Sequence, residues 1–138
     1  MVVIFVLAAL PFAATFSLYY PDERHYSDGA VQMLAGQGWL IPHTAAGTVR
    51  LEKPPLAYWL IAACYKVFGV SAFSSHLPFL LAGCGTIWLT YRLGRKLTQK
   101  TGTALIAAAV VASHPQFFLA CIRSIPDSLL VFFVTLSA

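Results

Sequence analysis

Charged side chains are scarce in this sequence, and their scarcity excludes most classes of protein. Of its 138 residues, 10% are charged and 59% are hydrophobic, and the mean hydropathy is +0.74. Soluble domains carry about 25% charged residues, so this chain has too little polar surface to cover a water-soluble globule. The same composition excludes intrinsic disorder. Because the apolar residues fall in long continuous runs, the sequence predicts an all-α membrane protein.

Motifs for disulfides, metal centres and nucleic-acid binding are also missing. Cys64, Cys84 and Cys121 lie singly in apolar surroundings without a CxxC pair, which is typical of small buried side chains. The four histidines have no HExxH spacing. The net charge of +4 comes from bases at the ends of apolar segments rather than from a solvated basic face, so we expect no nucleic-acid partner.

Uncharged runs predict where the chain crosses the bilayer. Residues 1–20 carry no charged side chain and, at 1.5 Å per residue, reach about 30 Å, the thickness of a hydrocarbon core. A cleaved signal peptide is the alternative, but no basic segment begins this run, and Tyr19-Tyr20 replace small cleavage-site residues. The predicted order is transmembrane helices at 1–20, 76–91 and 101–122, an external loop at 21–75, a basic cytoplasmic loop at 92–100, an external turn at 123–127, and the start of a truncated fourth helix at 128–138.

The orientation follows from four bases without an acid among them, Arg92, Arg95, Lys96 and Lys100. Such clusters mark the cytoplasmic side of a membrane. Alternation then places the long loop and all five acids on the opposite side. We therefore expect a multi-pass protein of the plasma (inner) membrane whose active face is external or periplasmic.

Two short helices are expected in the external loop. Ser27 would cap the first, which would run through Leu34 and stop at Gly36. The second would cover 54–69, where aromatic residues and flanking lysines favour a helix lying in the membrane interface.

Three polar groups are candidate functional sites, and each has a plainer interpretation. Asp22-Glu23 is either a solvated helix end or an acid/base or metal-binding pair, because adjacent carboxylates repel and one pKa rises. Lys53, beside Glu52 and two prolines, either meets a lipid phosphate or snorkels to water with Glu52 as its partner. Arg123 and Asp127 form either a second part of the site or a surface ion pair.

Several blocks, in this order, carry a resemblance to a known family. The blocks are Asp22-Glu23-Arg24-His25-Tyr26, residues 33–42, Glu52-Lys53-Pro54-Pro55-Leu56-Ala57-Tyr58-Trp59-Leu60, residues 68–73, residues 91–95 and residues 123–130. Together they resemble the first external loop and following helices of the family 39 type integral-membrane glycosyltransferases, which include aminoarabinose transferases of lipid A and protein O-mannosyltransferases. The resemblance extends from about residue 20 to residue 138.

This resemblance implies the N-terminal part of a GT-C fold, with transmembrane helices, an external catalytic region and a polyprenyl-phosphate-linked sugar as donor. It implies that Asp22, with Glu23 beside it, activates the acceptor hydroxyl, and that Asp127 is a second catalytic acid. Glu52 and Lys53 would border the lipid phosphate, Arg123 would assist them, and Tyr58 is predicted to bind substrate. A divalent metal is a candidate cofactor, with Asp22 and Glu52 as its candidate ligands.

The main hypothesis is therefore a membrane glycosyltransferase acting on a lipid, glycan or protein acceptor of the cell envelope. Its alternative is a non-catalytic membrane fragment that binds polyprenyl phosphate or assembles with the rest of a split enzyme. A transporter fragment is a third hypothesis, but no charge within a predicted span supports it. An isolated chain of this length is expected to lack regions that the family uses for its acceptor.

Overall fold

The computed structural model describes residues 1–15, 21–36, 38–44, 47–49 and 54–138, and of Pro21 and Asp22 it describes the backbone only. Its regular structure is helical, which confirms the predicted all-α class. The helices are α1 (Val2–Thr15), α2 (Pro21–Leu34), α3 (Leu56–Phe68), α4 (Ala72–Thr98), α5 (Thr101–Ser113), α6 (Pro115–Cys121) and α7 (Asp127–Leu136).

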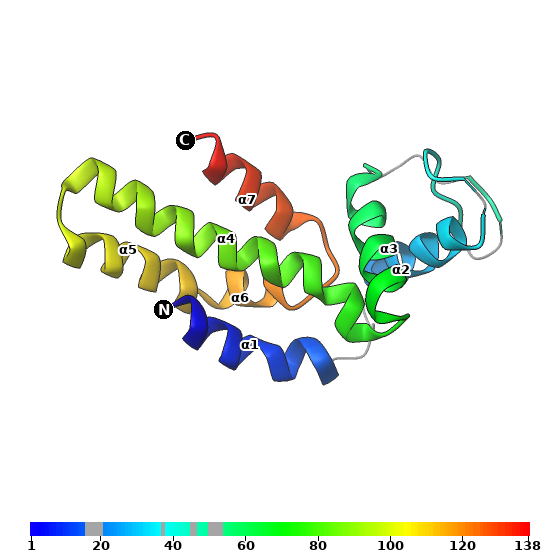
Figure 1. Ribbon diagram of the computed structural model, residues 1–138, viewed down its shortest axis with the longest axis horizontal. Helices are drawn as coiled ribbons and strands as arrows, with labels where there is room; N and C mark the ends of the chain where they lie inside the picture. The colour runs from blue at the N-terminus through cyan, green and yellow to red at the C-terminus, as the bar shows by residue number, and fades with distance from the viewer. Residues whose placement is uncertain (16–20, 37, 45–46, 50–53) are drawn as a thin grey trace.

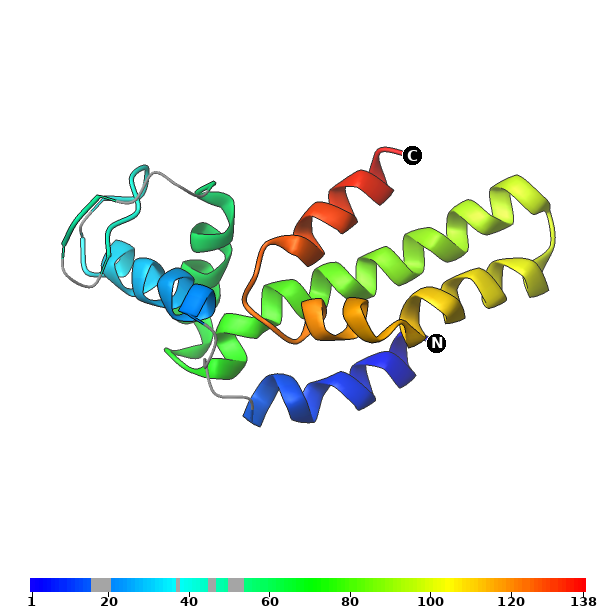
Figure 2. The same ribbon diagram turned by 180° about the vertical axis from the view of Figure 1, so that it is seen from behind.

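Helix α4 is the axis of the molecule, and most other helices pack on it. Helices α1, α5, α6 and α7 lie along its length, while α2 and α3 form a lobe at its N-terminal end (Figures 1 and 2). Ser71 starts α4 because its hydroxyl accepts a hydrogen bond from the Ser74 N–H at 3.1 Å. Gln99 ends it in the left-handed conformation, at φ 59°.

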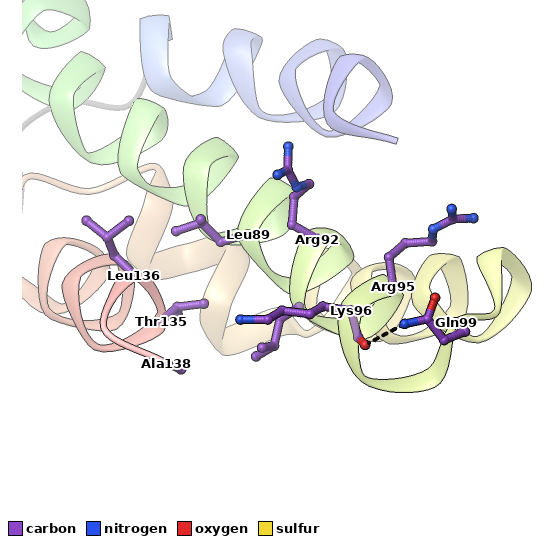
Figure 3. A pocket seen from close by; sticks show the side chains of 9 residues that line it. Leu89, Arg92, Arg95, Lys96, Gln99, Thr135, Leu136 and Ala138 are labelled. Carbon is purple, nitrogen blue, oxygen red and sulfur yellow. Dashed lines mark hydrogen bonds between the residues drawn. The ribbon is translucent and has the colours of Figure 1, made fainter.

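The sequence predicted a transmembrane helix over 76–91, and α4 is longer at both ends. It spans 27 residues, about 40 Å, and its last turns carry Arg92, Arg95 and Lys96 (Figure 3). Leucine, arginine and lysine are good helix formers and no proline lies between Arg92 and Thr98, so nothing ends the helix where the charges begin. The basic residues therefore lie on a helix rather than in a loop.

The predicted span at 101–122 is broken into α5 and α6, whose axes differ by 68°. Pro115 lacks an N–H and disfavours a helical conformation at His114, so the chain leaves the helix there and starts another. His114 caps the new helix, since its Nδ1 accepts from the Phe117 N–H at 3.4 Å.

By length and hydropathy, one described helix, α4, can cross a bilayer alone, and the α5–α6 pair would make a second span. Helices α1, α3 and α7 are apolar but shorter. The predicted membrane boundaries and their sidedness stay predictions.

Helix α2 begins earlier than the sequence predicted. It starts at Pro21, a residue that suits the first turn of a helix, instead of at a Ser27 cap. Its end agrees with the prediction: the helix stops at Leu34, and Gly36 has a φ of 92°, which glycine adopts readily. Ser27 consequently lies inside the helix and is free to bond another element.

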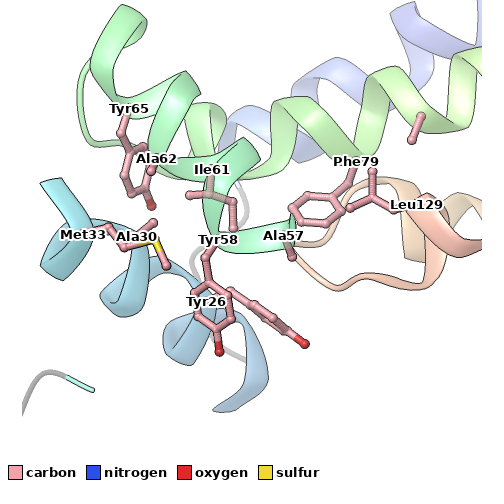
Figure 4. Packing of buried hydrophobic residues seen from close by; sticks show 11 residues of the cluster. Tyr26, Ala30, Met33, Ala57, Tyr58, Ile61, Ala62, Tyr65, Phe79 and Leu129 are labelled. Atoms are coloured by element: carbon pink, nitrogen blue, oxygen red, sulfur yellow. The ribbon is translucent and has the colours of Figure 1, made fainter. Parts of the chain in front are cut away.

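Buried aromatic residues join the lobe to the rest of the molecule. Tyr26 of α2 packs on Tyr58 of α3, with ring centroids 4.9 Å apart, and Phe79 of α4 lies beside Leu129 of α7 in the same cluster (Figure 4). A Cβ on Gly29 would lie 2.6 Å from the Tyr58 ring, so α2 and α3 approach as closely as they do because residue 29 has no side chain.

A second cluster joins α1, α4, α5 and α6 at the other side of the central helix. Phe5 of α1 contacts Phe118 of α6 edge to face at 5.8 Å. Gly83 of α4 lies directly against the Cys121 thiol of α6. Cys121 is fully buried, as the sequence predicted for its cysteines, while Cys64 and Cys84 are half-buried.

Candidate functional site

Glu23 is a carboxylate buried inside the protein. It lies in the first turn of α2 with only 2% of its surface exposed. Its Oε1 accepts a hydrogen bond from the Ser124 N–H at 3.0 Å, and Ser124 lies in the turn between α6 and α7, 101 residues away. A carboxylate removed from water needs such partners, because leaving it unpaired is expensive.

His76 is the second ionisable group at this point. Its Nδ1 lies 2.8 Å from the Ala13 carbonyl oxygen, which can only accept, so Nδ1 carries a hydrogen and donates. The other ring nitrogen, Nε2, therefore faces Glu23 Oε1, at 3.5 Å.

A chain of serine hydroxyls connects the same elements. Ser27 and Ser75 share a hydrogen bond of 2.9 Å, and Ser75 and Ser124 share one of 2.7 Å. All three are buried. We call Glu23, Ser27, Ser75, His76 and Ser124 the Glu23 network.

The Glu23 network fixes the relative positions of elements that are distant in the sequence. It joins the start of α2, the start of α4 and the turn before α7, and His76 adds the end of α1. Hydrogen bonds in a low-dielectric interior are strong and directional, so this cluster holds its members in one arrangement. The interpretation of Glu23 as part of a solvated helix end is therefore wrong.

The other residues of the predicted acidic and basic blocks are only partly described. Asp22 is the second residue of α2, where a negative charge is stabilised by the helix dipole, but its side chain lies outside the described residues. Glu52 and Lys53 lie wholly outside them. The candidate metal ligands are thus Asp22 and Glu52 by sequence alone, and the described residues include no cluster of three metal-ligating side chains.

The structure places the block that contains Arg123 and Asp127 next to the block that contains Asp22 and Glu23. Arg123 is half-buried and directly precedes Ser124, whereas Asp127 is exposed at the first position of α7. No described residue forms an ion pair with Asp127, so the surface pair proposed as the plainer interpretation of Arg123 and Asp127 is not formed.

Tyr58 lies in the core between α2 and α3, with 1% of its surface exposed. Its ring packs on Tyr26, and Gly29 makes room for it. Because Tyr58 packs against α2, the block around residue 58 lies next to the block that contains Asp22 and Glu23. Substrate binding by Tyr58 stays a prediction.

Ser75, His76 and Ser124 were missed as site residues by sequence reasoning. One signal was present: Ser74, Ser75 and His76 are three polar residues in succession at the start of an apolar run. Polar side chains there require partners when the helix is buried, which identifies them as network candidates. Their partners could not be named, because they come from three other parts of the chain.

The described part of the chain is helical and includes a helix long and apolar enough to cross a bilayer, and the comparisons identify its family. The family described as dolichyl-phosphate-mannose-protein mannosyltransferase matches residues 52–138. The chain belongs to this family of glycosyltransferases. The resemblance noted from the sequence is thereby confirmed.

Relatives and solved structures agree on the kind of protein. The chain is 35% identical over 96 residues to an undecaprenyl phosphate-alpha-4-amino-4-deoxy-L-arabinose arabinosyl transferase of Pseudomonas aeruginosa, covering 70% of this chain and 17% of the relative. An uncharacterized protein of Aquifex aeolicus is 34% identical over 121 residues, covering 88% of this chain and 24% of that protein.

The fold matches part of a solved structure. The crystal structure of ArnT from Cupriavidus metallidurans in the apo state matches with a TM-score of 0.80 at 25% identity, over 97% of this chain and 25% of that chain. The same protein bound to undecaprenyl phosphate matches with a TM-score of 0.79. This chain therefore spans about a quarter or less of the length of these proteins.

Proposed function

We propose that this chain carries part of the catalytic site of a membrane glycosyltransferase that moves a sugar from a polyprenyl-phosphate donor to a hydroxyl or phosphate acceptor on the external membrane face. One observation carries the proposal. Glu23 bonds the Ser124 amide, so the Asp22-Glu23 block and the Arg123–Asp127 block meet although 101 residues separate them. Acidic and basic groups gathered at one helix end suit a reaction that moves both a proton and a phosphate.

The donor class is supported by the relatives. The Pseudomonas relatives are named as undecaprenyl phosphate-dependent sugar transferases, and the ArnT structure binds undecaprenyl phosphate. The sugar and the acceptor, whether a lipid, a glycan or a protein, are proposed only as classes.

In the proposed reaction, Asp22 accepts the proton of the acceptor hydroxyl, and the hydroxyl oxygen forms a bond to the anomeric carbon. The bond from that carbon to the phosphate oxygen breaks with inversion, so no covalent enzyme intermediate forms. Lys53 and Arg123 stabilise the charge on the departing polyprenyl phosphate. A phosphate acceptor is already ionised and would need no base.

Glu23 has a different role in this proposal. Its carboxylate accepts the hydrogen bond of the Ser124 amide and faces His76, so it positions the first turn of α2 rather than reaching the acceptor.

A divalent metal at Asp22 and Glu52 would supply a further positive charge for the phosphate.

The test uses the full polypeptide that contains this segment, with transfer measured from a panel of prenyl-phosphate sugars in membranes. Asp22→Asn and Lys53→Ala should each reduce transfer at least about a hundredfold, since general-base and charge-stabilising groups contribute that much. Asp28→Asn is the matched control on the same helix, because Asp28 is half-buried and forms none of the hydrogen bonds of the Glu23 network. Full turnover by both variants would exclude the assignment, and donor binding without turnover by the unmodified protein would favour the non-catalytic alternative.

A further inference from the structure

His76 is a fully buried histidine that the proposed reaction does not use. It is the fifth residue of α4, and none of its surface is exposed. Its Nδ1 donates to the Ala13 carbonyl oxygen at 2.8 Å, and its Nε2 lies 3.5 Å from Glu23 Oε1. One imidazole ring therefore contacts both the end of α1 and the start of α2.

The two contacts lie on either side of Asp22 in the sequence. Ala13 precedes Asp22, near the end of α1, and Glu23 follows it directly. Because an imidazole ring is rigid, contacts at its two nitrogens fix how far the end of α1 lies from the start of α2. The backbone of Asp22 is thereby held from both sides.

Helix α4 gives the ring a fixed position. Ser75, the residue before His76, shares hydrogen bonds with Ser27 of α2 and with Ser124 of the turn before α7, at 2.9 and 2.7 Å. Directional bonds in a buried site hold the start of α4 in one arrangement. His76 therefore extends from a backbone that is already anchored to the elements that carry Asp22 and Arg123.

Packing alone does not account for a histidine at this position. Nε2 is buried and forms no hydrogen bond with any residue that the structure describes. A buried polar atom without a hydrogen bond destabilises a fold, whereas an apolar side chain would fill the same space without that penalty. The charged group that Nε2 faces is Glu23, the neighbour of the proposed base. Proteins retain such destabilising arrangements mainly where a reaction needs them.

We propose that His76 is a positioning residue for the base Asp22, on which it acts through Glu23 and the end of α1. This role rests on the proposed function, and in it His76 contacts neither the donor nor the acceptor. A displacement of about 1 Å at a reacting group can lower the rate about a hundredfold. Loss of either contact of His76 should therefore lower kcat. The KM for the donor should stay unchanged, because Lys53 and Arg123 are proposed to bind its phosphate.

The test compares two variants that each keep one of the two contacts. The amide nitrogen of His76→Asn replaces Nδ1 and can still donate to Ala13, whereas the amide nitrogen of His76→Gln replaces Nε2 and can still face Glu23. Both are measured in the full polypeptide in membranes, with the prenyl-phosphate sugar of the panel that the wild type transfers fastest. Each variant should lower kcat about tenfold or more and change the KM for that donor less than about twofold.

His114→Asn is the matched control, because His114 is an exposed histidine that caps α6 and asparagine also caps helices well. It should transfer at the wild-type rate. All rates are divided by the amount of folded protein, counted as the monodisperse fraction in size-exclusion chromatography.

A double-mutant cycle with Asp22→Asn separates positioning from a general effect on the fold. If His76 acts through Asp22, adding His76→Asn to Asp22→Asn should lower the residual transfer, followed with a radiolabelled sugar, by less than about twofold. A side chain that only stabilises the fold would lower transfer by the same factor in both backgrounds.

Wild-type kcat in both His76 variants, a change in KM alone, or the same loss in both backgrounds of the cycle would overturn the proposal. If Asp22→Asn loses transfer while the His76 variants keep it, only the role of His76 is wrong. Full transfer by Asp22→Asn would overturn the proposed base and this role with it.

Discussion

At the scale of single residues, the most informative side chain is that of Glu23. In the sequence it is one of two neighbouring acids, and in the structure it is a buried acceptor bonded to the Ser124 amide. Burial separates the roles of the two neighbours: Glu23 holds the turn before α7, and Asp22 is left as the proposed base.

Glu23→Ala should destabilise the protein by about 1–3 kcal/mol, because the Ser124 N–H would lose its acceptor in a buried site. Glu23→Gln should cost less, since an amide oxygen can still accept that hydrogen bond. The free energy of unfolding is measured by sodium dodecyl sulfate titration in mixed micelles, followed by circular dichroism. Equal stability of Glu23→Ala and the wild type would show that the network contributes nothing.

At the scale of secondary-structure elements, close contacts between helices place the site. Helices α2 and α3 meet at Gly29 and Tyr58, and this contact sets the position of the α2 start. The Glu23 network then ties that start to α4 and to the turn before α7.

Gly29→Ala should destabilise the protein by about 1–3 kcal/mol, because the new methyl group would overlap the buried Tyr58 ring and force α2 and α3 apart. The matched control is Gly102→Ala in α5, where a Cβ meets nothing within 4 Å. That change should be neutral or stabilise by up to about 1 kcal/mol, since alanine favours helix. Thermal unfolding of both variants in detergent measures the difference, and similar effects of the two substitutions would contradict the proposed packing.

At the scale of the whole molecule, α4 separates two polar regions. Its first turns contribute Ser75 and His76 to the Glu23 network, and its last turns carry Arg92, Arg95 and Lys96. The distance of about 30 Å between them equals the thickness of a hydrocarbon core. A helix of this length can therefore place the two regions at opposite faces of one membrane.

The predicted sidedness can be tested by cysteine labelling in intact cells. An impermeant maleimide should label Leu40→Cys, in the exposed part of the loop, and should label Gly102→Cys only after lysis. The wild type is the control: its thiols are buried or half-buried, and burial raises the pKa of the Cys64 thiol, so few thiolates are present to react. The reverse labelling pattern would invert the predicted topology.

The sequence by itself determined the class and the family of this protein. The scarcity of charged residues and the long apolar runs decide whether the chain folds in water or in a lipid bilayer, because the free energy of transferring a segment from water into lipid depends mainly on its own composition. The blocks around Asp22 and Asp127 likewise carry the family resemblance directly. The stop of α2 before Gly36 was predictable because a left-handed residue is a local property of the chain.

Only the tertiary structure decided which of these polar residues are buried and what they touch. The bond from Glu23 to Ser124 joins positions 101 residues apart, and the bond from His76 reaches back 63 residues to Ala13. The start of α2 at Pro21 and the position of Ser27 inside that helix were also mispredicted, since the Ser27 hydroxyl bonds Ser75 instead of capping its own helix. Which residues are buried, what they bond and where a helix starts depend on how the helices pack. That packing is set by partners that are distant in the sequence.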